Sequence, residues 1–355
     1  MTEGSAWSSS LKICFLMYPW ERISPETDTT LRMIHEAAAR GHTVAITTPN
    51  SLTIRDSVAH AFCNVLRKQE KLTSNIPAFY RRAEFKRCKL PLAGFDAIIM
   101  RANPPLDTVA LNFLDSVRND TFIMNDIDGL RIANNKLYPA SFSGDASRFI
   151  PATHVSKNRE YLEQVLRDSP TGKMIMKPLN GYGGQGVIVI EKSARQNFRS
   201  LLDFYIGSGD SSNYVILQEY VSGAEQGDVR ILMLNGEPIG AMRRVPSGDD
   251  VRSNIHAGGK EVKHHLTKEE KELCRAIGPQ LVRDGLYFAG LDVINGKLIE
   301  VNVLSPGGIT RINRLNRVKL QSLVIDFIEN VVSAKERVIE RKSTFRKVIE
   351  DAEAI

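Results

Sequence analysis

The stretch that most constrains the fold of this chain is Met174 to Gly186, which reads MIMKPLNGYGGQG. An apolar run typical of a buried strand ends at Lys177, and a loop very rich in glycine follows it. The β-branched run over 187–190 then predicts a second strand. A glycine-rich loop between two strands, with a lysine at its root, can lay backbone N–H groups over phosphate oxygens. By itself the loop also fits an ordinary glycine-rich hairpin.

The same loop contains a G-x-G-x-x-G pattern, formed by Gly181, Gly183 and Gly186. A dinucleotide-binding fingerprint must open a helix directly, because the helix N-terminus holds the pyrophosphate. A strand is predicted here instead, so the pattern does not indicate a dinucleotide site. The sequence also contains no G-x-x-x-x-G-K-[ST], which excludes a P-loop.

Length and charge narrow the class of protein. The chain has 355 residues, enough for two or three domains, with 42% hydrophobic and 25% charged residues, as in ordinary globular proteins. The net charge of +6 is mildly basic, and the charges are mixed along the chain. No basic stripe with interleaved aromatic residues occurs, so nucleic-acid binding is possible but not indicated and we expect no nucleic-acid partner. An anionic small-molecule substrate would suit the charge equally well.

Cysteine usage and hydropathy indicate a compartment. The four cysteines lack C-x-x-C spacing, so they predict neither a disulfide framework nor a zinc site. No apolar run reaches transmembrane length, and the polar start MTEGSAWSSS has no signal-peptide core. We therefore expect a cytoplasmic protein that does not engage a membrane, with residues 1–10 as a disordered leader.

The first third of the chain has the pattern of a parallel sheet. Residues 11–17 and 43–47 predict strands around a helix over 31–40, a β-α-β opening. Residues 50–90 predict a solvated helix and a surface connection. The strand over 95–100 ends at Arg101, at a carboxyl edge where open α/β sheets bind ligands. Arg101 is thus a candidate substrate contact, although a surface turn would suit it equally. This pattern of a parallel sheet with helical crossovers ends near residues 130–135, where we place the boundary of the first domain.

The remainder alternates strands, hairpins and helices. Strands are predicted over 215–220, 228–234, 239–244, 288–294 and 298–303, and helices over 161–167, 268–284 and 320–332. The long polar segment 246–259 has the profile of a mobile functional loop. Residues 333–355 predict a charged helical tail.

Three groups of polar residues accompany the glycine loop. Lys136 and Lys177 supply compact cations for phosphate oxygens. Asp292, Glu300 and Asn302 alternate with apolar residues on a predicted hairpin, so their oxygens can share one face and suit Mg²⁺. Arginines that can clamp a carboxylate or a phosphoryl group lie around the 246–259 loop, namely Arg230, Arg243, Arg244 and Arg252. Each group alone also fits a solvated surface.

Ordered segments carry a resemblance to a known family. They are Ile98–Arg101 with Pro104–Pro105, Asn135–Leu137, Met176–Leu179 with the glycine loop, Gln218–Tyr220, Gly227–Arg230, Arg252–Asn254 with Ala257–Gly259, Gly290–Asp292, and Glu300–Val303 with Ser305–Pro306. Together they resemble the ATP-grasp superfamily and, more narrowly, bacterial-type glutathione synthetases, from about Leu11 to about Glu329.

The resemblance implies an α/β fold with two parts. A parallel-sheet, Rossmann-like domain that binds substrate would span residues 11–132. An ATP-grasp module of two α+β subdomains would follow over 133–330, with a lid subdomain over 133–222, a C-terminal subdomain over 223–330 and the nucleotide between them. The charged tail would occupy 331–355.

The resemblance also implies roles for individual residues. ATP would be held by Lys136, Lys177, the loop glycines Gly181, Gly183 and Gly184, the adenine-edge strand Gln218, Glu219, Tyr220 and Val221, and the ribose contact Asp228. Mg²⁺, or Mn²⁺ in its place, would be bound by Asp292, Glu300 and Asn302. The reaction centre would include Arg230, Arg252, Asn254, Gly258 and Gly259, and substrates would contact Arg101, Arg244, Ser305, Gly307 and Gly308.

The implied reaction joins γ-glutamylcysteine to glycine at the expense of ATP, through an acyl phosphate. This agrees with the residues themselves, because no convincing Cys/His or Ser/His pair is present and the acyl phosphate needs no protein nucleophile. We expect a homo-oligomer, a dimer or a tetramer. Two alternatives stay open: another ATP-grasp carboxylate–amine ligase, and a non-catalytic ATP-binding regulatory protein.

Overall fold

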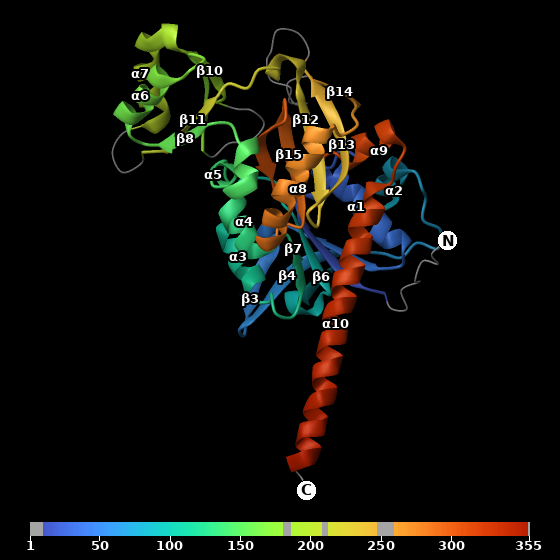
Figure 1. Ribbon diagram of the computed structural model, residues 1–355. Coiled ribbons are helices and arrows are strands. Elements are labelled where there is room, and N and C mark those ends of the chain that lie inside the picture. Colours follow the sequence, from blue (N-terminus) through green and yellow to red (C-terminus); the bar gives the residue numbers. More distant parts are fainter. Residues whose placement is uncertain (1–9, 180–185, 208–211, 247–258, 354–355) are drawn as a thin grey trace. The chain divides into compact units, whose positions relative to one another are not determined.

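The chain divides into two compact units (Figure 1). The computed structural model describes residues 10–179, 186–207, 212–246 and 259–353. One unit comprises residues 1–127 and 318–355, and the other residues 128–317. The predicted border after residue 132 differs from this division by a few residues. Residues 318–330, which the sequence assigned to the ATP-grasp domain, group with the N-terminal unit.

The N-terminal unit is built on a seven-stranded sheet with the order β3-β4-β2-β1-β6-β7, in which β5 also pairs with β4. Its strands are β1 (Lys12–Met17), β2 (Thr43–Thr47), β3 (Leu52–Arg55), β4 (Val58–Leu66), β5 (Phe85–Pro91), β6 (Ala97–Arg101) and β7 (Phe122–Met124). The strands β2, β1, β6 and β7 run parallel, which confirms the predicted parallel sheet. β1 and β6 lie at its centre, and their residues are almost entirely buried.

The interpretation of residues 50–90 as a helix and a surface connection was wrong. Three strands form in this segment, and β4 pairs antiparallel with β3, with β5 and with β2. The helix that does form there is short, α2 (Ile76–Arg82). In β4 buried and exposed residues alternate over most of its length, the period expected of a strand with one covered face. The charged residues on either side of this alternation obscured it.

Helices complete the N-terminal unit. They are α1 (Thr29–Ala39), α2, α3 (Thr108–Asp115) and the C-terminal α10 (Leu320–Glu353). The side chain of Asp28 accepts a hydrogen bond from the Leu31 N–H and caps α1, which stops before Gly41 at a φ of +85°. α10 joins the predicted helix over 320–332 and the predicted helical tail into one continuous helix.

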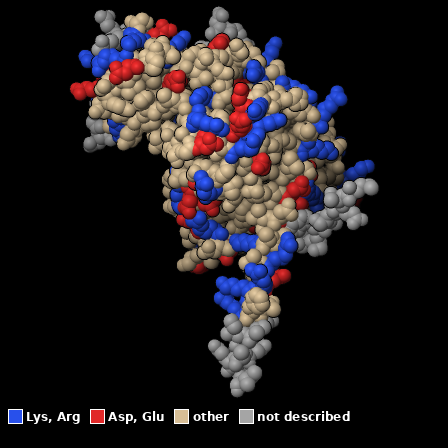
Figure 2. Space-filling model, in the orientation of Figure 1, with Lys and Arg blue, Asp and Glu red and all other residues tan. Residues whose placement is uncertain are grey.

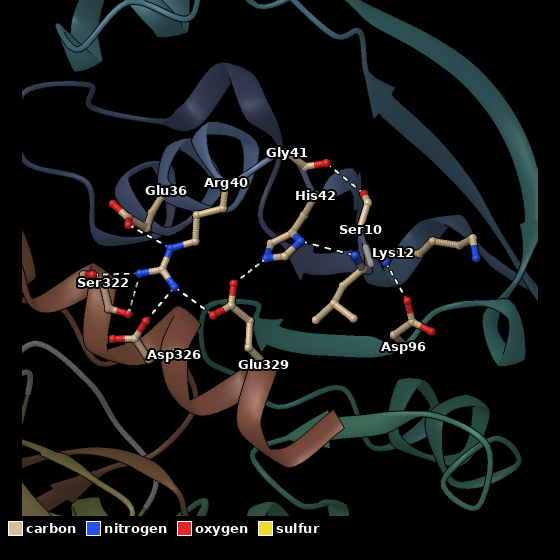
Figure 3. Close-up of polar contacts among 11 residues, drawn as sticks. Ser10, Lys12, Glu36, Arg40, Gly41, His42, Asp96, Ser322, Asp326 and Glu329 are labelled. Carbon is tan, nitrogen blue, oxygen red and sulfur yellow. Dashed lines mark hydrogen bonds and ion pairs between the residues drawn. The ribbon is translucent and has the colours of Figure 1, made fainter. Parts of the chain in front are cut away.

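The first part of α10 is attached to α1 by a polar cluster (Figure 3). Arg40 Nη1 donates to Asp326 Oδ1 at 2.6 Å and to Glu329 Oε2 at 2.8 Å. His42 Nε2 donates to the other oxygen of Glu329 at 2.8 Å, since its Nδ1 accepts the Leu11 N–H. Beyond residue 333 the described side chains of α10 are mostly exposed. No helix among the described residues is long and apolar enough to cross a membrane.

The second unit contains two sheets. A four-stranded sheet has the order β10-β9-β11-β8, and a five-stranded antiparallel sheet has the order β14-β13-β12-β15-β16. The strands are β8 (Thr153–Ser156), β9 (Lys173–Pro178), β10 (Ile188–Glu191), β11 (Val215–Glu219), β12 (Asp228–Leu234), β13 (Glu237–Val245), β14 (Lys260–Lys263), β15 (Phe288–Ile294) and β16 (Lys297–Asn302). This mixed architecture agrees with the predicted pair of α+β subdomains.

Helices cover the two sheets of this unit. They are α4 (Ile127–Ala133), α5 (Leu137–Ala140), α6 (Arg159–Asp168), α7 (Arg195–Ile206), α8 (Lys268–Arg283) and α9 (Ile309–Asn316). Leu162 and Leu166 of α6 pack with Met174 and Met176 of β9 in the core of the four-stranded sheet. A capping box between Thr267 and Glu270 starts α8 at the predicted position.

The two strands that flank the glycine loop, β9 and β10, form where the sequence predicted them. β10 pairs antiparallel with β9, so a strand follows the loop and the exclusion of a dinucleotide fingerprint is confirmed. Gly186 closes the loop at a φ of +69°, and a Cβ there would meet Pro178 Cγ at 3.3 Å. The loop glycines Gly181, Gly183 and Gly184 lie outside the described residues.

Candidate active site

Two lysines and a glutamate gather at the root of the glycine loop. Lys177 lies near the end of β9, Lys136 directly before α5, and Glu300 on β16. Lys136 Nζ is 3.6 Å from Glu300 Oε1, and the Lys136 N–H donates to the Leu179 carbonyl. These contacts bring two cations predicted to bind phosphates next to one predicted metal ligand.

Lys177 has an unusual environment for a lysine. Lys177 is 5% exposed, and its Nζ donates to Gln218 Oε1 at 2.9 Å. Burial lowers its pKa to about 8, the nearby Glu300 carboxylate opposes this shift, and Lys136 reinforces it. A cation so poorly solvated gains strongly from an anionic ligand, as expected of a phosphate-binding group.

The predicted adenine-edge strand forms the end of β11. Gln218 is buried and directs its side chain toward Lys177, a contact that the sequence did not reveal. The Glu219 N–H donates to the Ala152 carbonyl at 2.8 Å, and the Tyr220 ring lies under Lys173 Nζ at 4.7 Å. Val221 follows directly after this strand.

A buried network of two aspartates and two arginines crosses the five-stranded sheet. Arg230 donates to both carboxylate oxygens of Asp292, at 2.5 and 3.0 Å. Arg244 donates to both oxygens of Asp228 and also lies 2.8 Å from Asp292 Oδ1. The strand register explains these pairs, because Asp228 is opposite Arg244 and Arg230 is opposite Asp292. Residues predicted in four different roles therefore form one charge network.

The network shifts the pKa values of its two carboxylates in opposite directions. Burial by itself would raise the pKa of Asp292, but Arg230 and Arg244 outweigh it and lower this pKa to about 2. Burial and the charge of Asp292 raise the pKa of Asp228, against the opposing effect of Arg244. The pKa of Arg244 is raised, since the two aspartates overcome its own burial. Asp292 is thus held as a carboxylate at neutral pH.

The predicted metal ligands face one another on the β15–β16 hairpin. Asp292 is the cross-strand partner of Glu300, and Asn302 Nδ2 donates to Asp292 Oδ2 at 3.2 Å. In the part of the chain that the structure describes, no three His, Cys, Asp or Glu side chains form a metal-binding group, so the set depends on the amide oxygen of Asn302. An all-oxygen set of this kind fits a hard divalent cation, provided that the Asn302 amide turns its oxygen inward.

The turn after β16 connects this hairpin to α9. The Gly307 carbonyl accepts a hydrogen bond from Arg230 Nη1 at 3.3 Å, and Gly308 has a φ of +132°. Ser305 lies three residues after the end of β16. Gly259 lies directly before β14, whose Glu261 is the cross-strand partner of Arg244. Of the predicted reaction-centre residues, Arg252, Asn254 and Gly258 lie outside the described residues.

Arg101 belongs to the N-terminal unit. It is the last residue of β6 and is 3% exposed, so the alternative of a surface turn is excluded. Its Nε donates to Thr30 Oγ1 at 3.0 Å, and Tyr18 and Asp28 interact with it electrostatically. Burial lowers the pKa of Arg101, and these neighbours oppose the shift. The sequence did not identify Thr30, which only the start of α1 brings to this strand end.

Comparison with known proteins identifies two matching family domains in this chain. The profile described as "Prokaryotic glutathione synthetase, N-terminal domain" matches residues 11–131, and the one described as "Prokaryotic glutathione synthetase, ATP-grasp domain" matches residues 135–317. A glutathione synthetase of Gloeobacter violaceus is 35% identical over 331 residues, covering 90% of this chain and 96% of the relative. One of Thermosynechococcus vestitus is 34% identical over 325 residues, covering 90% and 99%.

Solved structures with low identity share the fold. The D-cycloserine synthetase DcsG superposes with a TM-score of 0.60 at 14% identity, covering 91% of this chain and 99% of that structure. A RimK domain ATP-grasp protein from Sphaerobacter thermophilus gives 0.59 at 16% identity, covering 89% and 98%. The fold is therefore that of ATP-grasp proteins, and the chain belongs to the prokaryotic glutathione synthetase family.

Proposed function

We propose that the protein is an ATP-dependent carboxylate–amine ligase that joins γ-glutamylcysteine to glycine and so forms glutathione. The observation that carries this conclusion is the ordered match of both domains of the prokaryotic glutathione synthetase family, over residues 11–131 and 135–317. The arrangement of charges around Lys177 supports it, because it suits a polyphosphate ligand.

In this proposal Lys136 and Lys177 bind the phosphates of ATP. Asp292, Glu300 and Asn302 hold Mg²⁺, or Mn²⁺ in its place, which when bound neutralises charge on phosphate oxygens. The end of β11, from Gln218 to Val221, holds the adenine edge, and Asp228 the ribose. The buried pair of Arg230 and Asp292 supports the assignment of Asp292 to the metal site, since it keeps the Asp292 carboxylate ionised and oriented.

The chemistry requires positioning and cations more than a nucleophilic side chain. The cysteinyl carboxylate of the dipeptide attacks the γ-phosphorus of ATP, ADP leaves, and an acyl phosphate forms. The glycine amine then attacks the acyl carbon, the tetrahedral oxyanion collapses, and phosphate leaves as the amine loses a proton. Arg230 stabilises the negative charge that develops, with Arg252, Asn254 and the Gly258–Gly259 turn beside it. Arg101, Arg244 and the turn of Ser305, Gly307 and Gly308 orient the substrates.

A phosphate-release assay tests the reaction. Purified protein with ATP, Mg²⁺, γ-glutamylcysteine and glycine should release phosphate and form glutathione, and Lys177→Ala and Glu300→Ala should each abolish the release. Release only with another acceptor would replace the substrate but keep the reaction class. ATP binding without release under any acceptor would contradict an enzyme and support a regulatory protein.

The setting of the enzyme is also part of the proposal. We assign it to the cytoplasm as a homo-oligomer, a dimer or tetramer, with no membrane or nucleic-acid partner. All four cysteines are free thiols, as in proteins of a reducing compartment. Acidic and basic side chains are interspersed on the face drawn in Figure 2, which supports a soluble surface more than a nucleic-acid interface. Light scattering in solution tests the oligomeric state.

A further inference from the structure

Three side chains form a hydrogen-bonded line across the four-stranded sheet of the second unit. Lys177 lies on β9, Gln218 on β11 and Thr153 on β8. Thr153 and Gln218 are cross-strand partners, and Gln218 is two residues from Ile216, the partner of Lys177. Since alternate residues of a strand share a face, the three side chains lie on the same face of the sheet. The opposite face carries Met176 and Leu217 in the apolar core.

The direction of every hydrogen bond in this line is determined by chemistry. A lysine ammonium can only donate, so the Gln218 oxygen faces Lys177 Nζ, at 2.9 Å. The Gln218 Nε2–H must then face away, and it donates to Thr153 Oγ1 at 2.8 Å. The Thr153 hydroxyl in turn donates to the Pro151 carbonyl at 2.7 Å. The line therefore ends on a backbone carbonyl, which locks the orientation of the Gln218 amide.

The partner of the buried Lys177 ammonium is the neutral amide of Gln218, which leaves the lysine charge available to an anionic ligand. A carboxylate in the place of the Gln218 amide would form an ion pair and compete with phosphate for the ammonium. The amide oxygen orients the ammonium without neutralising its charge. The charged groups that act on Lys177 are Glu300 and Lys136, of opposite sign, and burial lowers its pKa to about 8. The cation thus keeps most of its attraction for an incoming anion.

We propose that Gln218 and Thr153 are positioning residues that hold the Lys177 ammonium in place for the phosphates of ATP. The proposal rests on the proposed function in one respect, that Lys177 binds ATP phosphates. Gln218 acts through its side chain, in addition to any contact of its backbone with adenine, and Thr153 acts through Gln218.

Four variants test the line, with Thr171→Val as a matched control on an exposed loop threonine of the same unit. Thr153→Val keeps the shape but removes the hydroxyl, and Thr153→Ser restores it. Gln218→Met removes the acceptor, and Gln218→Glu replaces it by a carboxylate. Each variant is checked for folding by thermal melting. ATP affinity is measured by titration calorimetry, and the Lys177 titration is followed by NMR of the lysine Cε in labelled protein.

Thr153→Val loses both hydrogen bonds of the hydroxyl, of which the one to Gln218 orients Lys177, so we expect it to bind ATP about threefold to tenfold more weakly, while Thr153→Ser and Thr171→Val stay close to wild type. Gln218→Met should weaken binding at least as much and lower the pKa of Lys177, because the charged amine loses its acceptor. Gln218→Glu should raise that pKa and still weaken ATP binding, since the carboxylate competes with phosphate.

The outcomes separate this inference from the proposed function. Wild-type ATP affinity in Thr153→Val and Gln218→Met, together with severe loss in Lys177→Ala, overturns the positioning role and leaves the phosphate role of Lys177 intact. Wild-type affinity in Lys177→Ala itself overturns that phosphate role. Equal weakening in Thr153→Val and Thr153→Ser also overturns the inference, because it would trace the effect to packing and not to the hydroxyl.

Discussion

Arg230 and Asp292 face each other from neighbouring antiparallel strands and share two hydrogen bonds, Nε to Oδ1 at 2.5 Å and Nη2 to Oδ2 at 3.0 Å. Such a bidentate pair is geometrically specific and, when buried, costly to break. Asp292 also accepts from Asn302 and lies beside Arg244. The candidate metal ligand is therefore held rigidly before any cation binds.

Removing the charge of Asp292 should destabilise the fold in a pH-dependent way. Asp292→Asn leaves two buried arginines with one carboxylate, so we expect a loss of about 3 kcal/mol at pH 6. The folded-state pKa of Asp292 is depressed from 3.8 to about 2, so its stabilisation is present above pH 3.8 and is lost as the pH falls through about 2. The difference in unfolding free energy between wild type and variant should shrink over that window in denaturant titrations. A constant difference from pH 6 to pH 2 would contradict the ionised pair.

Lys177→Met should stabilise the free protein and abolish ligase activity. The folded-state pKa of Lys177 is lowered from 10.5 to about 8, so the unfolded chain binds more protons between these values. Wild-type stability should therefore rise as the pH increases from 8 to 10.5, and below pH 8 the buried charge is a cost. We expect the unfolding free energy of Lys177→Met to exceed that of wild type by about 1–3 kcal/mol at pH 7 and not to rise between pH 8 and 10.5. Chemical denaturation at pH 7, 9 and 10.5 measures both, and a variant less stable than wild type at pH 7 would refute the argument.

Two glycines near Arg230 offer a matched comparison. A Cβ on Gly290 would meet Pro306 Cβ at 3.2 Å and Arg230 Cδ at 3.3 Å, whereas a Cβ on Gly307 meets nothing within 4 Å. Gly290→Ala should cost about 1–2 kcal/mol of stability and lower turnover by displacing Arg230. Gly307→Ala should melt like wild type, and any rise in its KM for glycine then reports contact with the acceptor. Equal stability of the two variants would show that the sheet absorbs the extra methyl group.

The attachment of α10 depends on a buried carboxylate. Glu329 is 4% exposed and accepts from both Arg40 and His42 (Figure 3). Glu329→Gln keeps one acceptor but loses the charge, so we expect a loss of about 2 kcal/mol. Asp326→Asn is the control, because Asp326 pairs with the same arginine from a half-exposed position and should cost less than about 1 kcal/mol. Thermal melts of the two variants that coincide would contradict the role assigned to burial.

Much of the architecture was predictable because it follows from local pattern. The β-branched run after Gly186 predicted β10, the Asn295–Gly296 turn predicted the β15–β16 hairpin, and Gly41 predicted the end of α1. Each depends on residues adjacent in sequence. The strands β3, β4 and β5 were missed, because charged residues obscure the alternation in β4 and because β4 finds two of its partners, β2 and β5, about 20 to 30 residues away along the chain.

The sequence by itself determined the family, the order of the strands around the glycine loop and the side chains that bear charge, since motif spacing and hydrophobic period are properties of the chain. Only the tertiary structure decided which charges meet. The pairing of Asp228 with Arg244 and the line from Lys177 through Gln218 to Thr153 arise from strand register across the sheets, and the start of α1 brings Thr30 to the buried Arg101. Register is set by packing over the whole sheet, and it brings together residues that no local pattern connects.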